Sequence, residues 1–311
     1  MLCVRTRGRR LLVPIAVIAV LSLVLLNGTD AFARSSSSAH GSRSSHHMTY
    51  YVSLGDSYAV GYQPAPRPGA TRGYTGIVSK ATHTRLVNFG CGGATTSSIL
   101  RVTGCTSPYG PAASDGAVSY PHETQAQAAV AFIDRHRASI GLVTVSIGGN
   151  DITHCASSSE PVTCVTAAIP SVEHNVATLA EELRKAAGPN VPIIGLTYPD
   201  VLLGLWVYPA SSPDTTLATL SVTGFRSLFN PALTKAYAAA GGHLVDITKE
   251  ADGYVPLSRT TKLAPYGRIP VAVAHVCRLT WYCQEGNIHA NTAGYDFIGK
   301  QVVAAYRALR R

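Results

Sequence analysis

Four residues of the types that serve in acyl transfer stand in loops of this chain. Ser57 lies in "SLGDSYAVG", Gly93 in "NFGCGGATTSS" and Asn150 in "SIGGNDIT", each after an apolar run. His289 lies in "CQEGNIHANTAGY", just before a helical pattern near the C-terminus. A serine hydroxyl beside an imidazole base is an activated nucleophile, and backbone N–H groups or a side-chain amide can hold an oxyanion. These residues predict attack on a carbonyl group, provided that the fold brings them together.

Each loop also has a purely structural explanation. Ser57 follows Asp56, and both residue types often begin a helix. The Gly-Gly and Asn-Asp pairs of the next two loops are common in turns. The G-x-S-x-G elbow of α/β-hydrolases is absent around Ser57, which disfavours that fold. The chemical interpretation gains support from the order of the loops, because a predicted strand precedes each of the first three.

Short apolar runs alternate with helical patterns along the chain. Strands are predicted at 49–54, 85–89, 141–147, 191–197 and 243–247, and helices at 122–136, 171–188 and 292–308. The last helix places Ile298, Val302, Ala305, Tyr306 and Leu309 on one stripe, which we expect to pack on the sheet. This order predicts an α/β fold with a five-stranded parallel sheet and helices on both faces. Ligands of such folds bind beyond the carboxyl ends of the strands.

The four motifs, taken in order, resemble those of the SGNH or GDSL family of serine hydrolases, whose name records these residue types. The resemblance spans residues 50–300 and is closest to the secreted, disulfide-bonded actinobacterial esterases and lipases. It implies a flavodoxin-like, three-layer α/β/α sandwich. It also implies that Ser57 is the nucleophile, that His289 is the base, and that the oxyanion hole consists of the Ser57 and Gly93 N–H groups and the Asn150 amide. No cofactor and no metal are implied.

The sequence departs from the family at the third member of the triad. Relatives with a full triad have Asp three residues before the histidine, and that position here is Gly286. An acid normally selects the tautomer of the base, so its absence needs a substitute. We expect a backbone carbonyl of the "LTWYCQEG" loop to accept the Nδ1 proton of His289. Glu285 is the alternative carboxylate, and Asp246 is a more distant one.

The N-terminal part predicts export. Residues 1–33 combine four arginines, an apolar run of about 16 residues and a small-residue site ending at Ala33, which is the pattern of a cleaved signal peptide. An uncleaved anchor is the alternative. Residues 34–47 predict a flexible Ser-rich leader, and residues 48–311 predict one domain. We therefore expect a secreted, extracellular protein without a stable membrane anchor.

The charge of the chain restricts its partners. The formal net charge is +9, and removal of four arginines and one aspartate with residues 1–33 leaves +6. Charged residues are only 14% of the chain, and no basic run follows residue 33, so nucleic-acid binding is not indicated. We expect a monomer that acts on a small-molecule or lipid ester.

The cysteines beyond Cys3 form three near-neighbour couples. These are Cys91 with Cys105, Cys155 with Cys164, and Cys277 with Cys283. An even number in an exported chain favours disulfides, and we choose the pairing that closes the shortest loops. A metal site is the alternative, but no couple has the C-x2-C spacing of zinc ligands.

The apolar segment 198–213 suggests a place for an acyl chain. The candidate groove residues are Leu202, Leu203, Leu205 and Trp206, which either line a pocket or fill the core. Trp281 and Tyr282 beside the base carry the same two alternatives. His46, His47 and His154 lack the partners of a metal site, and we expect them to be solvated.

The sequence as a whole predicts a secreted serine esterase or lipase. The alternatives are an O-deacetylase of carbohydrates that uses the same residues, and a non-catalytic cell-surface binding module that has lost activity through Gly286.

Overall fold

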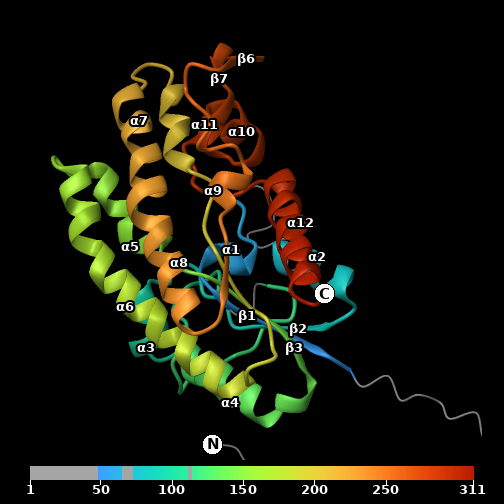
Figure 1. Ribbon diagram of the computed structural model, residues 1–311. Coiled ribbons are helices and arrows are strands. Elements are labelled where there is room, and N and C mark those ends of the chain that lie inside the picture. The colour runs from blue at the N-terminus through green and yellow to red at the C-terminus, as the bar shows by residue number, and fades with distance from the viewer. Residues whose placement is uncertain (1–47, 65–72, 111–113) are drawn as a thin grey trace, which may run out of the picture. The chain divides into compact units, whose positions relative to one another are not determined.

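The computed structural model describes residues 48–64, 73–110 and 114–311 (Figure 1). The predicted signal peptide and leader, residues 1–47, lie outside the described residues. The described chain contains a five-stranded parallel sheet in the order β2-β1-β3-β4-β5. Its strands are β1 (Tyr50–Gly55), β2 (Arg85–Asn88), β3 (Ile140–Ser146), β4 (Ile193–Leu196) and β5 (His243–Val245). All five predicted strands are confirmed.

The strand order creates a switch point between β1 and β3. The chain adds β2 on one side of β1 and then crosses to add β3 on the other side. Val52 of β1 is paired with Val87 of β2 and with Val143 of β3. The loops after these strands diverge at their carboxyl ends, and this divergence leaves a crevice where open α/β sheets bind ligands.

Helices cover both faces of the sheet (Figure 1). Helices α4, α6 and α8 pack side by side on one face, and α2 packs against α12 on the other. The α-helices are α1 (Ser57–Val60), α2 (Tyr74–Thr82), α3 (Thr96–Arg101), α4 (Gln125–Arg135), α5 (Gly149–Thr153), α6 (Pro161–Ala187), α7 (Thr215–Gly224), α8 (Asn230–Ala239), α9 (Ile247–Glu250), α10 (Val271–Leu279), α11 (Tyr282–Glu285) and α12 (Thr292–Ala308). Helical turns of other types are η2 (Arg137–Ser139), η3 (His154–Ser157), η4 (Val201–Trp206) and the π-helical η5 (Phe225–Phe229). This is the three-layer α/β/α sandwich that the sequence predicts.

The three predicted helices are confirmed, with one correction. Helix α4 begins after Thr124, whose side chain accepts a hydrogen bond from the N–H of Gln127, and α12 has its predicted bounds. Helix α6 ends at Ala187, with Gly188 as the predicted stop at its C-cap, but it begins ten residues before the predicted start. Pro170 misleads there, since proline usually marks a helix start, whereas here α6 continues through it. Disulfide bonding of Cys164 and packing of Ile169 hold the preceding turns in helical form.

A second apolar cluster lies beside the main core, and the sequence reasoning did not predict it. The short antiparallel strands β6 (Thr260–Leu263) and β7 (Gly267–Pro270) lead into α10. Leu203, Val273 and Cys277 are buried in this cluster. The cluster supports η4 and α11, and α11 leads directly into the loop of His289. Within the described ranges, no helix is long and apolar enough to span a membrane.

One arginine ties together the ends of two helices in the face that covers β4 and β5. The guanidinium of Arg184, near the end of α6, donates hydrogen bonds to five backbone carbonyl oxygens at 2.7–3.3 Å. Three belong to the loop after α6 and two to the end of α8. Carbonyl groups at helix ends have no partner within the helix. The Arg184 side chain therefore supplies hydrogen-bond donors to carbonyl groups that follow α6 and α8.

We predict that Arg184→Lys lowers the free energy of unfolding by about 2 kcal/mol, because one ammonium group cannot span the five acceptors. Urea denaturation measures the effect. The neighbouring exposed substitution Lys185→Ala is the control and should change stability by less than about 0.5 kcal/mol. An unchanged urea midpoint for Arg184→Lys would contradict this assignment.

Candidate active site

Ser57 and His289, which are 232 residues apart, meet at the carboxyl edge of the sheet. Ser57 is the first residue of α1, directly after β1, and the side chain of Asp56 caps this short helix by accepting the N–H of Tyr58. The Oγ of Ser57 lies 2.8 Å from Nε2 of His289. This distance is that of a hydrogen bond between a hydroxyl and an imidazole.

The side chain of Asn287 determines which nitrogen of His289 carries the proton. Its Oδ1 lies 3.0 Å from the backbone nitrogen of His289 and 2.8 Å from Nδ1. Because the backbone N–H can only donate, the amide must present its oxygen to both groups. Nδ1 is therefore protonated, and the lone pair of Nε2 faces the hydroxyl of Ser57.

The expected partners of Nδ1 were wrong. Neither Glu285, nor Asp246, nor a backbone carbonyl of residues 279–286 occupies that position, which Asn287 takes. Asp246 instead accepts hydrogen bonds from Asn230 and Tyr254. The pattern that signals Asn287 is its place two residues before the histidine, where an Asn side chain can turn back onto the following backbone.

Gly286 has no room for the missing acid. Its φ is +66°, a left-handed conformation that ends α11, and a Cβ atom there would lie 2.6 Å from the ring of Tyr208. Side chains rarely adopt this backbone conformation. The backbone conformation of Gly286 therefore excludes an aspartate at this position, and the same turn positions Asn287.

Burial determines the basicity of His289. Desolvation lowers the pKa of its imidazole from 6.5 to about 4, and its two hydrogen-bond partners, Asn287 and Ser57, are both neutral.

The ring of Tyr62 lies against the imidazole of His289 at 4.4 Å between centroids. The hydroxyl of Tyr58 donates to the carbonyl oxygen of Ile288 at 2.7 Å. The helix of the serine thus braces the loop of the histidine.

The loops of Gly93 and Asn150 lie against each other beside Ser57. The Asn150 amide donates to the carbonyl oxygen of Ala94 at 2.9 Å, and the carboxylate of Asp151 accepts the N–H of Thr96 at 2.9 Å. The second amide hydrogen of Asn150 remains for another acceptor. Gly93 has φ of +79°, a backbone conformation that favours glycine.

A buried carboxyl group supports the turn beneath Ser57. Asp56 accepts a hydrogen bond from the hydroxyl of Tyr198 at 2.6 Å, and only 2% of its surface is exposed. Burial raises the pKa of Asp56 to about 7. The hydrogen bonds that hold this side chain come from the hydroxyl groups of Tyr198 and Ser146 and from the backbone N–H of Tyr58, not from His289, so its role is to hold the turn.

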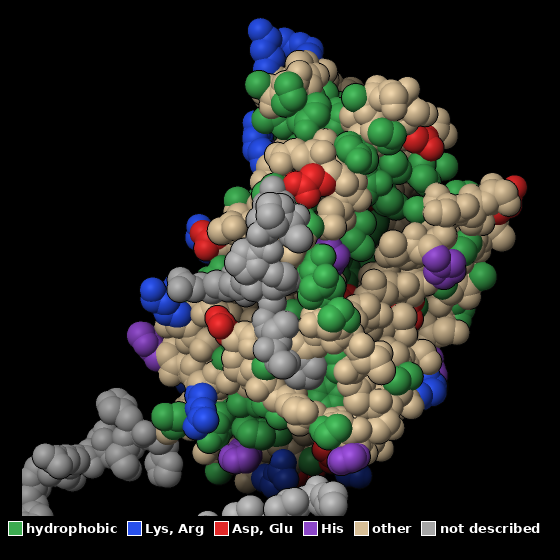
Figure 2. All heavy atoms as spheres, turned by 180° about the vertical axis from the view of Figure 1, so that it is seen from behind, with side chains coloured by type: hydrophobic (Ala, Val, Ile, Leu, Met, Phe, Trp, Pro, Cys, Tyr) green, Lys and Arg blue, Asp and Glu red, His purple; other side chains and the backbone are tan. Residues whose placement is uncertain are grey.

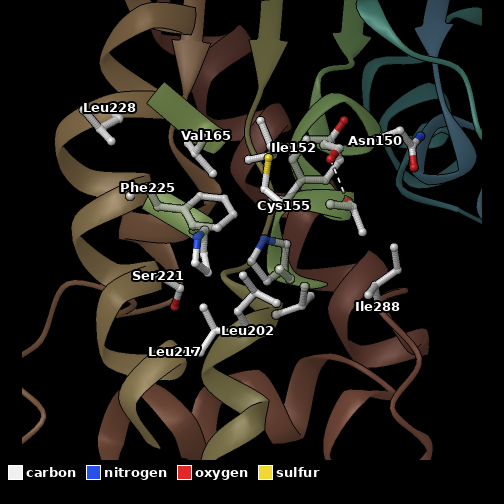
Figure 3. Close-up of a pocket in the computed structure, with 18 of the residues that line it drawn as sticks. Asn150, Ile152, Cys155, Val165, Leu202, Leu217, Ser221, Phe225, Leu228 and Ile288 are labelled. Carbon is white, nitrogen blue, oxygen red and sulfur yellow. Dashed lines mark hydrogen bonds between the residues drawn. The ribbon is translucent and has the colours of Figure 1, made fainter. Parts of the chain in front are cut away.

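An apolar cavity of about 250 Å³ opens next to Ser57 (Figure 3). One wall comes from α5, η3 and the start of α6, and the other from η4, α7 and η5. Side chains that line it include Ile152, Val165, Leu202, Leu217, Phe225, Leu228 and Ile288. In Figure 3, Asn150 and Ile288 lie at one end of the cavity, and Phe225 and Leu228 lie at the other.

The cavity resolves most of the alternatives for the apolar loop. Leu202 lines it, whereas Leu203 is fully buried in the second apolar cluster. Leu205 and Trp206 are not part of the lining, so the groove prediction is wrong for them. The indole of Trp281 donates to the side chain of Gln63 at 3.1 Å, and Tyr282 packs on Gly204.

The three predicted disulfides are present with the predicted pairing. His154 is exposed, and its Nε2 lies 3.6 Å from Sγ of Cys164 and 3.8 Å from Sγ of Cys155. These three side chains cluster like metal ligands, but sulfur atoms joined to each other are not thiolates. His46 and His47 lie outside the described residues.

The fold and the site define a class. A parallel α/β/α sandwich with a hydrogen-bonded Ser–His pair at its switch point has the arrangement of a serine hydrolase. Residues 53–297 match the GDSL-like Lipase/Acylhydrolase family, so the chain belongs to that family, whose members are carboxylic ester hydrolases.

Comparison with solved structures finds similar chains at low sequence identity. The lipase Lip_vut3 from a goat rumen metagenome is 17% identical with a TM-score of 0.52, over 83% of this chain and 97% of that one. The extracellular lipase from Streptomyces rimosus is 17% identical with a TM-score of 0.49, over 83% and 98% of the two chains. Phospholipase A1 from Streptomyces albidoflavus NA297 is 19% identical with a TM-score of 0.42, over 73% and 94%. Comparison with curated protein sequences finds no match.

We predict that His289 titrates with a pKa of about 4. Asn287→Asp should raise this pKa markedly, because the introduced carboxylate stabilises the imidazolium. NMR titration of the imidazole measures both values, and Glu285→Gln is the control that should leave the titration unchanged. Titration of His289 near 6.5 in the unmodified chain would contradict the prediction.

Proposed function

We propose that this protein hydrolyses carboxylic esters through an acyl-enzyme on Ser57, with His289 as the general base. The observation that carries the proposal is the 2.8 Å hydrogen bond between Oγ of Ser57 and Nε2 of His289. This pair lies at the edge of the apolar cavity that Ser57 and Asn150 line. A nucleophile, an aligned base and a pocket for one side of the substrate therefore adjoin each other.

In the first half of the reaction, Oγ of Ser57 attacks the ester carbonyl carbon while Nε2 of His289 takes the hydroxyl proton. The oxyanion accepts hydrogen bonds from the N–H groups of Ser57 and Gly93 and from the Asn150 amide. The tetrahedral intermediate then expels the alkoxide, which receives the proton from Nε2. An alcohol leaves, and the acyl group remains on Ser57.

In the second half, Nε2 takes a proton from a water molecule that attacks the acyl carbon. Collapse of the second tetrahedral intermediate breaks the bond to Ser57, whose oxygen regains the proton from Nε2. A carboxylic acid is released. Asn287 keeps the Nδ1 proton in place through both halves, and because Asn287 is neutral, the main counter-charge to the imidazolium is the oxyanion itself.

The lining of the cavity supports an acyl chain as the group bound there. Ile152, Val165 and Phe225 offer apolar surface, as expected of pockets for hydrocarbon chains. An O-deacetylase of carbohydrates would need polar groups that bind sugar hydroxyls, and the lining of this cavity supplies few such groups. The aligned Ser57 and His289 also argue against a binding module without catalysis.

We further propose that the protein acts outside the cell. The three disulfides support this, because such bonds persist in oxidising compartments. The signal peptide predicted at residues 1–33 would provide the export route, and sequencing the N-terminus of the secreted chain would test cleavage after Ala33.

We predict that p-nitrophenyl esters are hydrolysed and that KM falls as the acyl chain lengthens from acetyl, by up to about fourfold per added methylene until the cavity is full. Ser57→Ala should abolish the activity. A panel from acetyl to palmitoyl esters, with acetylated xylan beside it, measures both. Failure of the unmodified chain on every p-nitrophenyl ester would refute the proposal, and a clear preference for xylan would favour the deacetylase.

Removal of one oxyanion donor should lower turnover with the fold intact. We predict that Asn150→Ala reduces kcat by about 100-fold or more, whereas Glu285→Gln stays close to the unmodified chain because Asn287 holds the base. Circular dichroism of each variant checks folding. A kcat for Asn150→Ala within about threefold of the unmodified chain would remove this residue from the oxyanion hole.

A further inference from the structure

The mouth of the apolar cavity lies between two helical segments that carry no charged residue. These are residues 161–172 at the start of α6 and 215–224, which form α7. Both segments contribute to the lining of the cavity. Solvent-facing sides of helices usually carry charged residues, so two facing helical segments of this length without any form an unusual surface.

The exposed side chains of these segments form what we call the uncharged rim. Its members are Val162, Thr163, Thr166, Ala167, Pro170 and Ser171 on α6, and Thr215, Thr216, Thr219, Leu220 and Thr223 on α7. Val162 is 48% exposed and Leu220 is 40% exposed, and they are two of only five large hydrophobic side chains exposed to this degree in the described part of the chain. Both also line the cavity, so they stand at its edge. Seen from behind, the molecule shows hydrophobic side chains gathered around a hollow in its upper half (Figure 2).

The charges around the rim indicate the kind of surface that it fits. Glu160 and Asp214 directly precede the two segments. Glu173 follows the first segment and forms an ion pair with Lys235, and Arg226 follows α7. Acidic and basic groups thus border the rim without a dominant sign. Helices that bind anionic membranes carry lysine and arginine beside their apolar face, and the rim has none. An electrically neutral partner surface fits this arrangement.

We propose that the uncharged rim docks on the surface of a zwitterionic phospholipid aggregate, so that the ester substrate is drawn from lipid into the cavity. This proposal rests on ester hydrolysis at Ser57. Val162 and Leu220 enter the interfacial layer, and the threonine hydroxyls lie among the headgroups. An acyl chain then passes from lipid into the cavity between the two segments, so its hydrocarbon remains out of water along the way.

Two threonines allow the rim to be tested without altering the cavity. Thr166 lies one helical turn after Val162, and Thr216 lies one turn before Leu220. Neither lines the cavity. The double variant Thr166→Glu/Thr216→Glu would place two carboxylates against the lipid surface. The double variant Thr166→Val/Thr216→Val would enlarge the apolar contact with lipid.

The experiment measures flotation of the exported chain with phosphatidylcholine vesicles, in the Ser57→Ala background so that lipid is not consumed. We expect the glutamate pair to weaken vesicle binding about tenfold and the valine pair to strengthen it. Val102→Glu/Ala138→Glu places the same charges on exposed positions that do not line the cavity, and it should bind as the parent does. Binding should vary little with salt, since no charge attraction drives it.

A second readout separates this proposal from the proposed function. With Ser57 present, the glutamate pair should retain kcat/KM on p-nitrophenyl acetate and lose about tenfold in rate on ester lipid within vesicles. Activity on the soluble ester with no vesicle binding by the parent chain would overturn docking and leave ester hydrolysis intact. Vesicle binding without any ester hydrolysis would overturn the function instead. A dimer of the parent that the glutamate pair dissociates would show that a second copy covers the rim, which also overturns lipid docking.

Discussion

The hydrogen bond between Ser57 and His289 requires a neutral imidazole that keeps its proton on Nδ1. Asn287 meets this requirement through one oxygen atom, which accepts both the backbone N–H and the Nδ1 proton of His289. The acceptor and the base lie two residues apart, so their geometry is set within one turn of chain. A distant acid would instead depend on the packing of another element. The price of this local solution is the loss of a negative charge beside the imidazolium.

The rest of the molecule holds that short turn in register with Ser57. The carboxyl ends of β1 and β3 bring the serine and asparagine loops together at the switch point. Tyr58 binds the carbonyl oxygen of Ile288, so the helix that begins with Ser57 also positions the residue before His289. Each disulfide joins residues close to one part of the site: Cys91 precedes Gly93, Cys155 lines the cavity, and Cys283 precedes Asn287.

The strands and the Ser–His pair could be predicted because their signals are local or follow from the order of elements. Apolar runs identify buried strands, and the carboxyl ends of parallel strands meet at one edge, so Ser57 and Asn150 had to be neighbours. The start of α6 was missed because Pro170 has the same local signal as a helix start. The partner of Nδ1 was not predicted, because a carboxylate or a carbonyl is the usual acceptor, whereas the turn at Gly286 brings the side chain of Asn287 onto Nδ1.

The sequence by itself determined the layered α/β fold, the three disulfide pairs and the residue types of the site. Periodicity, cysteine spacing and motif order all act over short stretches of chain, so they can be read without coordinates. Only the tertiary structure decided that Leu202 lines the cavity while Leu203 fills the second apolar cluster. It also decided that α6 and α7 face each other across that cavity. Neighbouring residues of a helical turn point in different directions, and which direction meets core, cavity or solvent depends on elements far away in the chain.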